Sequence, residues 1–451
     1  MQKTQHYTSS NAPILGQAVT LPTYESPQKF ETTNSYRNAW AAILWVVSVL
    51  SVFVVGFVRL GDGTHGGGSL PGYQACAKII GYITLAVSVA TALSIPVHYL
   101  VRHHAEGLIY FGNVCYIFFL SGLCVYAFVS GTIVGGVILL IFTLVYAWWF
   151  ASMRDRIPFA AICLRTSAEI INTYKATVLN AFFWLIVEVV FLVFWALGIY
   201  NTQRGDKEGF DLGAVTWLWL FFFYWTTQVI SGIVHVTTCG VVAMWYFTGT
   251  ELPMPPNPTL GALRRATTYS LGSICLGSLI VAALKVFRAM VNQATRNENE
   301  FVRCIVRSLV TCLENMMVYF NEYAYVHVAI YGKCYLEAAR DTWRLVHGSG
   351  ILAIINDQLL QLVYLMFIVG GSLITGVVLL AVQGAWTFFG LGVLLGLVVM
   401  SLLLGVVQSG VMTIFVCFAE EPMALQRSNC GFYDALNTAM AGLSPEEESH
   451  V

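Results

Sequence analysis

The chain has 451 residues, of which 57% are hydrophobic and only 10% are charged, and its mean hydropathy is +0.70. Soluble domains carry about 25% charged residues, so this composition excludes an ordinary soluble protein. The formal net charge of -1 provides no field that would recruit nucleic acid. Several uncharged runs exceed the roughly 20 residues that a helix needs to cross the hydrocarbon layer. An all-α, polytopic membrane protein is therefore predicted.

The N-terminal part of the chain predicts a tail, an anchor helix and then closely spaced helices. Residues 1–39 are polar and contain several prolines, so they are expected to form a disordered cytoplasmic tail without a cleavable signal peptide. The first two spans are predicted over 40–58 and 78–101, with a glycine-rich loop between them. Residues 108–150 contain no charged side chain and are too long for one crossing. They are predicted to form two spans that turn near Ser130–Gly131.

The middle of the chain is oriented by its basic loops. Lysine and arginine concentrate in the loops 151–175 and 248–268, and cytoplasmic loops carry an excess of these residues. Both loops are therefore assigned to the cytoplasm, on the same side as the N-terminus. The spans next to these loops are predicted over 178–199, 212–247 and 269–290.

The C-terminal third is harder to orient, because basic residues occur at both ends of the region 291–357. One further span is predicted within it. Residues 358–419 contain no charged side chain and are expected to form two long helices with a break near Gln383–Gly384. The prediction is a transmembrane domain of about ten spans over 40–419. A cytoplasmic C-terminal tail is expected over 420–451.

Polar groups inside predicted spans are the first candidates for a functional site. Each costs at least about 2.5–3.5 kcal/mol at a helix centre unless it faces a cavity or a partner. Glu188 lies in an apolar run, with Trp184 one turn earlier on the same helix face. Glu314, Asn321 and Tyr325 share one face of a later helix. Glu188 is either a site residue or a structural group that is protonated or hydrogen-bonded, and Asn321 either lines a pathway or bridges two helices.

A second candidate site is aromatic. The segment "TWLWLFFFYWTTQV" places Trp217, Tyr224 and Trp225 on a nearly continuous ring surface of one helix. Such a surface attracts quaternary ammonium ions, with roughly 0.5–2 kcal/mol from each ring. One of the carboxylates above would supply the counter-charge, so the combination favours a small alkylammonium substrate. The alternative is that these rings serve packing and the membrane interface.

Other polar residues carry weaker signals. Glu322 is predicted to lie near a helix end in a solvated position, and His235 is either a satisfied polar contact or a proton relay. The eleven cysteines form no CxxC pair, and the Walker, Rossmann, GxSxG and HExxH patterns are absent. Neither a metal, a cofactor nor an enzymatic activity is expected.

Four segments resemble the choline transporter-like family, most closely its fungal "pH nine sensitive" branch. They are "FFYWTTQVISGIVHVTTCGVVAMWYF", "LRRATTYSLGSICLGSLIVAAL", "YFNEYAYVHVAIYGKCYLEAARDTWRLV" with "SGILAIIND", and "TIFVCFAEEP", in the expected order. The resemblance implies a ten-span carrier with both termini in the cytoplasm. It would move choline or a related amine such as ethanolamine, by facilitated diffusion or in exchange for protons, across the plasma membrane or an internal membrane. The chain departs from the family pattern at Gly232, often asparagine, and at Glu322, usually basic.

Two other functional classes remain open. A channel or a lipid-handling protein without amine selectivity would have a similar hydropathy profile. A membrane scaffold is the third class, because the chain ends in "EEESHV" and a C-terminal Ser-x-Val can enter a PDZ-type groove by strand addition.

Overall fold

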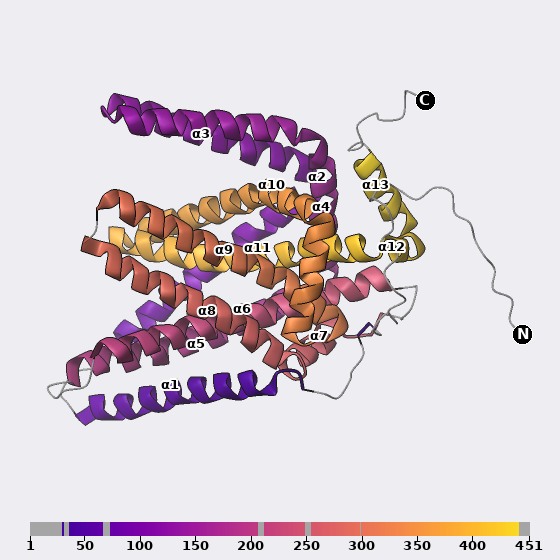
Figure 1. The fold of residues 1–451 in the computed structure, drawn as a ribbon. Helices are drawn as coiled ribbons and strands as arrows, with labels where there is room; N and C mark the ends of the chain where they lie inside the picture. Colours follow the sequence, from indigo (N-terminus) through magenta and orange to yellow (C-terminus); the bar gives the residue numbers. More distant parts are fainter. Residues whose placement is uncertain are drawn as a thin grey trace, which may run out of the picture.

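A computed structural model describes residues 29–30, 36–65, 73–205, 212–248, 254–297 and 299–441, and every regular element in these ranges is helical. Figure 1 shows long helices side by side, which confirms the predicted all-α polytopic fold. The helices are α1 (Ala39–His65), α2 (Tyr73–Val129), α3 (Ile133–Ser152), α4 (Ile157–Thr173), α5 (Ala176–Gly205), α6 (Leu212–Phe247), α7 (Pro258–Thr267), α8 (Leu271–Ala294), α9 (Glu300–Tyr331), α10 (Tyr335–Gln383), α11 (Trp386–Glu420), α12 (Pro422–Ser428) and α13 (Cys430–Ala441).

Eight of the described helices are long and apolar enough to cross a membrane. One of them, α2, contains an apolar stretch of 46 residues over Thr84–Val129, about 69 Å long if it were straight, which is more than twice the hydrocarbon thickness. Its backbone leaves helical geometry at His104, at φ -132° and ψ 32°. The arms on either side of this kink correspond to the second and third predicted spans. The eighth predicted span corresponds to α9, which at 32 residues is long enough to cross a membrane but is not among the helices that are also apolar enough.

Both predicted breaks within uncharged runs occur where expected. Helix α2 ends at Val129 and α3 begins at Ile133, whereas α10 ends at Gln383 and α11 begins at Trp386. A glycine in the left-handed region lies in each turn, Gly131 with φ +79° and Gly384 with φ +71°. Glycine adopts this conformation without the steric cost that a Cβ atom brings. These turns reverse the chain within an apolar sequence that has no charged residue to mark a loop.

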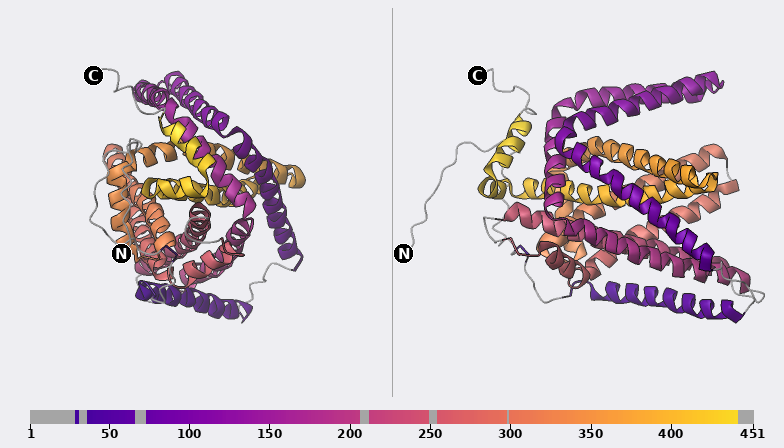
Figure 2. Two further views of the ribbon diagram at one scale, coloured as in Figure 1. Left: turned by 90° about the vertical axis from the view of Figure 1, so that its right-hand side faces the viewer. Right: turned by 180° about the vertical axis from the view of Figure 1, so that it is seen from behind.

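The helices form a bundle with surface elements at one end. In Figure 1, α4 and the N-terminal part of α10 run across the right-hand end of the bundle, where α7, α12 and α13 also lie, and the left view of Figure 2 looks onto this end. The second arm of α2 and α3 form a separate hairpin along one edge. Apolar side chains such as Phe118 and Val134 are exposed on this hairpin, as expected for a surface that faces lipid.

Helix α6 lies at the centre of the bundle. In its most apolar window, 83% of the residues are buried, whereas this share is between 17% and 44% in the other seven candidate spans. It packs against α5, α7, α8, α9 and α11. The C-terminal half of this helix is therefore largely enclosed by protein, whereas most of the aromatic residues nearer its start are half-buried. The polar side chains of α6 become candidates for a site.

The described part of the predicted N-terminal tail is bound to the protein. The N–H of Phe30 donates to the carbonyl oxygen of Ile330, 2.9 Å away. Lys29 forms an ion pair with Glu421, and its ammonium nitrogen lies 4.2 Å from the ring centre of Phe247. The predicted C-terminal tail contains α12 and α13. The last residues of the chain, with the PDZ-type sequence, and most of the glycine-rich loop lie outside the described residues.

Candidate substrate-binding site

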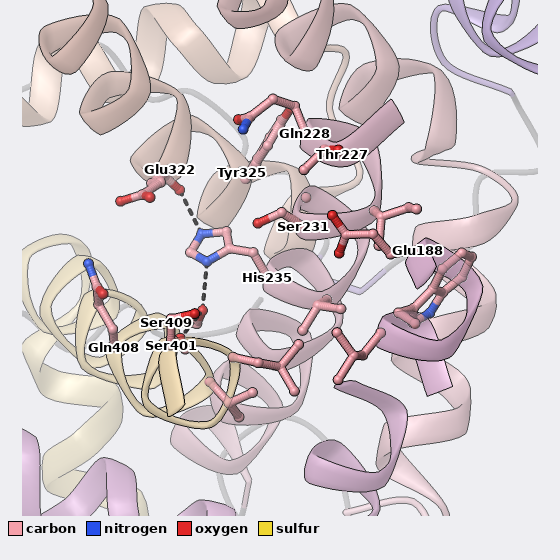
Figure 3. Close-up of a pocket in the computed structure, with 18 of the residues that line it drawn as sticks. Glu188, Thr227, Gln228, Ser231, His235, Glu322, Tyr325, Ser401, Gln408 and Ser409 are labelled. Atoms are coloured by element: carbon pink, nitrogen blue, oxygen red, sulfur yellow. Dashed lines mark hydrogen bonds between the residues drawn. The ribbon is translucent and has the colours of Figure 1, made fainter. Parts of the chain in front are cut away.

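A cavity of about 450 Å³ lies between α5, α6, α9 and α11 (Figure 3). This volume falls within the range of about 300–1,000 Å³ that is typical of small-molecule sites. The wall combines apolar side chains with hydroxyl, amide, imidazole and carboxylate groups. Its lining residues are Trp184, Leu185, Glu188, Thr227, Gln228, Ile230, Ser231, Gly232, Val234, His235, Val318, Asn321, Glu322, Tyr325, Val398, Ser401, Leu402, Gly405, Val406, Gln408, Ser409 and Met412.

Helices α5 and α6 supply one side of the cavity by simple helical spacing. Trp184 and Glu188 lie one turn apart on α5, and both line the cavity as their shared face predicted. On α6, Gln228, Ser231 and His235 recur at intervals of three and four residues, so they form a polar stripe on an otherwise apolar helix. Figure 3 shows the carboxylate of Glu188 directed toward Ser231 across the space between the two helices.

Helix α9 contributes Asn321 and Tyr325, which are 5% and 3% exposed. The Tyr325 hydroxyl donates to the carbonyl oxygen of Ile274 on α8, 2.8 Å away, and lies 3.0 Å from the Ser278 hydroxyl. The hydroxyl group is thereby held against α8, and Tyr325 also contributes to the lining of the cavity. The polar side chains predicted to share one face of α9 therefore contact protein or the cavity. They avoid the free-energy cost of exposure to lipid.

Glycines permit this close packing of α6, α8 and α9. A Cβ atom on Gly277 of α8 would overlap Asn321 and lie 2.8 Å from the Tyr325 hydroxyl. A Cβ atom on Gly232 of α6 would lie 2.8 Å from a methyl group of Ile274 and 3.2 Å from the Tyr325 ring. The choline transporter-like family, which the chain resembles, often has an asparagine at this position. That side chain would require Ile274 and Tyr325 to move. The glycine at this position leaves room for the Tyr325 ring, which lines the cavity.

His235 joins three of the helices around the cavity. Its Nε2 atom lies 3.0 Å from the backbone oxygen of Glu322 on α9, and its Nδ1 atom lies 2.8 Å from the hydroxyl oxygen of Ser409 on α11 (Figure 3). A carbonyl oxygen only accepts hydrogen bonds, so Nε2 carries a hydrogen atom. The ring is therefore held in one orientation and one tautomer when it is neutral.

The cavity favours a cation. Two carboxylates, Glu188 and Glu322, are among its lining residues, and no lysine or arginine is among those the structure describes there. Both glutamates are only half-buried. In a space surrounded by apolar helices, opposite charges attract more strongly than in bulk water because the effective dielectric constant is lower. A small organic cation is the ligand that this charge distribution suits.

The predicted ring surface on α6 does not line the cavity. Trp225 is 1% exposed, and its ring N–H donates to the carbonyl oxygen of Cys275 on α8, 3.0 Å away. The Tyr224 ring has Lys285 of α8 at 5.9 Å from its centre. Trp217 is half-buried and is also absent from the described lining. The contacts of Trp225 and Tyr224 are those expected of packing between α6 and α8, and the role of all three rings in binding stays a prediction.

Glu314, the second predicted counter-charge, lies outside the cavity lining. One of its carboxylate oxygens is 3.0 Å from Nε of Arg288 on α8, and the side chain of Glu314 is 5% exposed. Its charge is therefore compensated by a neighbouring guanidinium group. The structure brings Trp184, Glu188, Asn321 and Tyr325 together around one space and places Glu314 in a separate ion pair.

Sequence reasoning did not nominate several residues of the cavity. Glu322 was expected to be solvated near a helix end, but it lies inside α9 well before Tyr331 and lines the cavity. Gln408 and Ser409 come from α11. Like Glu188, they are polar residues within an apolar segment. An uncharged amide or hydroxyl group costs less to bury than a carboxylate, so these residues are weaker indicators of a site.

Comparison with known proteins places this arrangement in a family. The family profile described as "Plasma-membrane choline transporter" matches residues 137–423, which include all four helices of the cavity. Protein PNS1 of Debaryomyces hansenii is 30% identical over 348 residues, which cover 70% of this chain and 68% of that protein. Protein PNS1 of Mycosarcoma maydis is 33% identical over 350 residues, covering 69% and 64%.

A CTL-like protein of Dictyostelium discoideum is 30% identical over 343 residues, which cover 74% of this chain and 62% of that protein. The chain thus spans about two thirds of the length of these curated relatives. The profile match extends over more than half of the chain, and it agrees with the segments whose resemblance was noted in the sequence. The chain belongs to the choline transporter-like family of multi-pass membrane proteins.

Proposed function

We propose that the protein is a secondary carrier for choline or a related small amine such as ethanolamine, acting by facilitated diffusion or by exchange with protons. Membership of the choline transporter-like family supports a membrane transporter. The observation that carries the proposal for a cationic substrate is the cavity between α5, α6, α9 and α11, which has two carboxylates and no described basic side chain in its wall.

In this proposal the ammonium group binds beside Glu188. Trp184 lies one turn away on the same face of α5, so its ring can contribute a cation–π contact while the carboxylate compensates the charge. The side chains of Asn321 and Tyr325 orient α9 against the pathway. Hydroxyl and amide groups from α6 and α11 offer hydrogen bonds to the hydroxyl group that choline and ethanolamine share. Binding by a few weak contacts suits a carrier, because the substrate must also leave.

The experiment is uptake of labelled choline and of labelled ethanolamine into proteoliposomes that contain the purified full-length protein. Saturable flux above that of empty vesicles supports a carrier, and its response to an imposed pH gradient separates facilitated diffusion from proton exchange. Absence of saturable flux for both amines overturns the proposal. Single-channel currents would identify a channel, and lipid movement that excess choline does not change would identify a lipid-handling protein.

The plasma membrane is the proposed location, in line with the description of the matching family. A PDZ-type partner at the C-terminal Ser449–His450–Val451 is a separate proposal that rests on sequence alone. Fractionation of cells expressing the full chain, or a chain without its last four residues, tests both. The proposed location is wrong if the full chain accumulates in internal membranes. The proposed PDZ-type partner is wrong if the deletion leaves the distribution of the protein unchanged.

A further inference from the structure

The hydrogen bonds of His235 are compatible with two protonation states of its ring. The Ser409 hydroxyl has one hydrogen atom and two neighbouring acceptors: Nδ1 of His235 at 2.8 Å and the carbonyl oxygen of Gly405, also at 2.8 Å. When the ring is neutral, Ser409 donates to Nδ1. When the ring is protonated, Nδ1–H donates to Ser409, which turns its own hydrogen atom toward Gly405. The Nε2–H bond to Glu322 is kept in both states.

A proton can therefore bind to or leave Nδ1 by rotation of one hydroxyl group, without movement of a helix. Several titratable groups face the ring. Helix α5 presents Glu188 across the cavity, and α9 presents Glu322 together with Tyr325, whose ring centre lies 6.3 Å from that of His235. On α6 itself, the Cys239 sulfur lies 3.5 Å from Nε2. The described part of the cavity wall from α11 consists of hydroxyl, amide and apolar groups.

The same cavity is the proposed binding space for a cationic amine. An imidazolium and an ammonium ion in one low-dielectric space repel each other, whereas either one alone is attracted by the two carboxylates. We propose that His235 is the group whose protonation competes with the cationic substrate for the cavity. When the amine binds, the proton leaves Nδ1 for water, and the Ser409 hydroxyl turns back to donate to the ring. This inference rests on the proposed function, because it requires an amine in the cavity.

The inference predicts the direction of a pH effect. Since the protonated ring excludes the amine, affinity decreases as pH falls through the range in which His235 of the amine-free protein takes up its proton. Affinity reaches a plateau at higher pH. One competing proton changes the dissociation constant by up to about tenfold per pH unit. Choline is the appropriate probe, because its quaternary nitrogen does not titrate and any pH effect must come from the protein.

The test is equilibrium binding of labelled choline to the purified full-length protein in nanodiscs, between pH 4.0 and 8.5. The readout is the ratio of dissociation constants at the two ends of this range. Protonation of the cavity carboxylates at low pH also lowers choline affinity. The informative quantity is therefore the difference in this ratio between wild type and His235→Gln. We expect a markedly smaller ratio in His235→Gln. His347→Gln, which changes an exposed histidine in α10, is the matched control and should keep the wild-type ratio.

Ser409→Ala is the second variant, and it keeps the proposal testable if His235→Gln does not fold. It removes the acceptor of the Nδ1–H bond, so protonation becomes less favourable and the loss of affinity should move to lower pH. Calorimetry in two buffers of different ionisation enthalpy counts the protons released per choline bound, and His235→Gln should release fewer. Equal pH ratios in wild type and His235→Gln, or an unshifted profile in Ser409→Ala, overturn the inference. Failure of the wild type to bind choline at any pH, together with an absence of saturable flux for both amines, overturns the proposed function itself.

Discussion

The most informative single perturbation is Glu188→Gln. Glutamine keeps the size and much of the hydrogen-bonding capacity of the side chain but removes its charge, so it tests whether the carboxylate compensates a bound cation. Glu188 is half-buried on α5 and faces the polar stripe of α6 across the cavity (Figure 3). Because the cavity wall has no described lysine or arginine that competes for this charge, a bound ammonium ion would interact with it directly.

The expected magnitude follows from the surroundings of the carboxylate. A hydrogen bond to a charged group contributes about 1.5–3 kcal/mol. Coulomb's law gives about 4 kcal/mol for unit charges 4 Å apart at an effective dielectric constant of 20, and water in a half-open cavity reduces this value. A loss of about 1.5–3 kcal/mol corresponds to a dissociation constant that is roughly 10 to 150 times larger.

The assay is equilibrium binding of labelled choline at pH 8, normalised to folded protein, followed by uptake into proteoliposomes. Glu314→Gln is the matched control, because Glu314 is also a glutamate in a long helix but is paired with Arg288 outside the cavity lining. Loss of the Glu314 charge should lower the thermal stability of the protein and leave its choline affinity within about twofold of the wild-type value. The reasoning is refuted if Glu188→Gln binds choline as tightly as the wild type, or if Glu314→Gln weakens binding by the same factor.

Three further predictions concern contacts between helices and the attachment of the N-terminal segment. Gly277→Ala adds a methyl group that overlaps α9, so a destabilisation of about 1–3 kcal/mol and a lower melting temperature are expected; Gly370→Ala, in open space, should not lower it. Lys29→Gln removes the ion pair with Glu421, and faster proteolysis of the N-terminal segment in the intact protein should follow, whereas an unchanged rate would contradict a stabilising role. Trp225→Ala should lower thermal stability more than Trp225→Phe, because the buried ring fills the α6–α8 interface, and a loss of stability alone would assign the ring to packing. Affinity lost in the alanine variant and restored by phenylalanine would instead assign the ring to the substrate.

The positions of the helices followed from the sequence to a large extent. The thickness of the hydrocarbon layer sets a length for each span, so a long uncharged run has to turn, and glycine marks the turn because it adopts positive φ. This reasoning located the breaks at Gly131 and Gly384, which the structure confirms. It also separated the two arms of α2, which continue through His104 as one bent helix rather than ending in a loop.

The sequence by itself determined which polar groups are costly enough in a span to require a partner or a cavity. It also determined which of them share a helix face, such as Trp184 with Glu188 and Asn321 with Tyr325. Only the tertiary structure decided which faces meet. The rotation of each helix about its axis depends on packing against distant segments, and a periodic pattern in one helix contains no information about them. For this reason Glu188 opens into the cavity, whereas Glu314 turns to an arginine of α8.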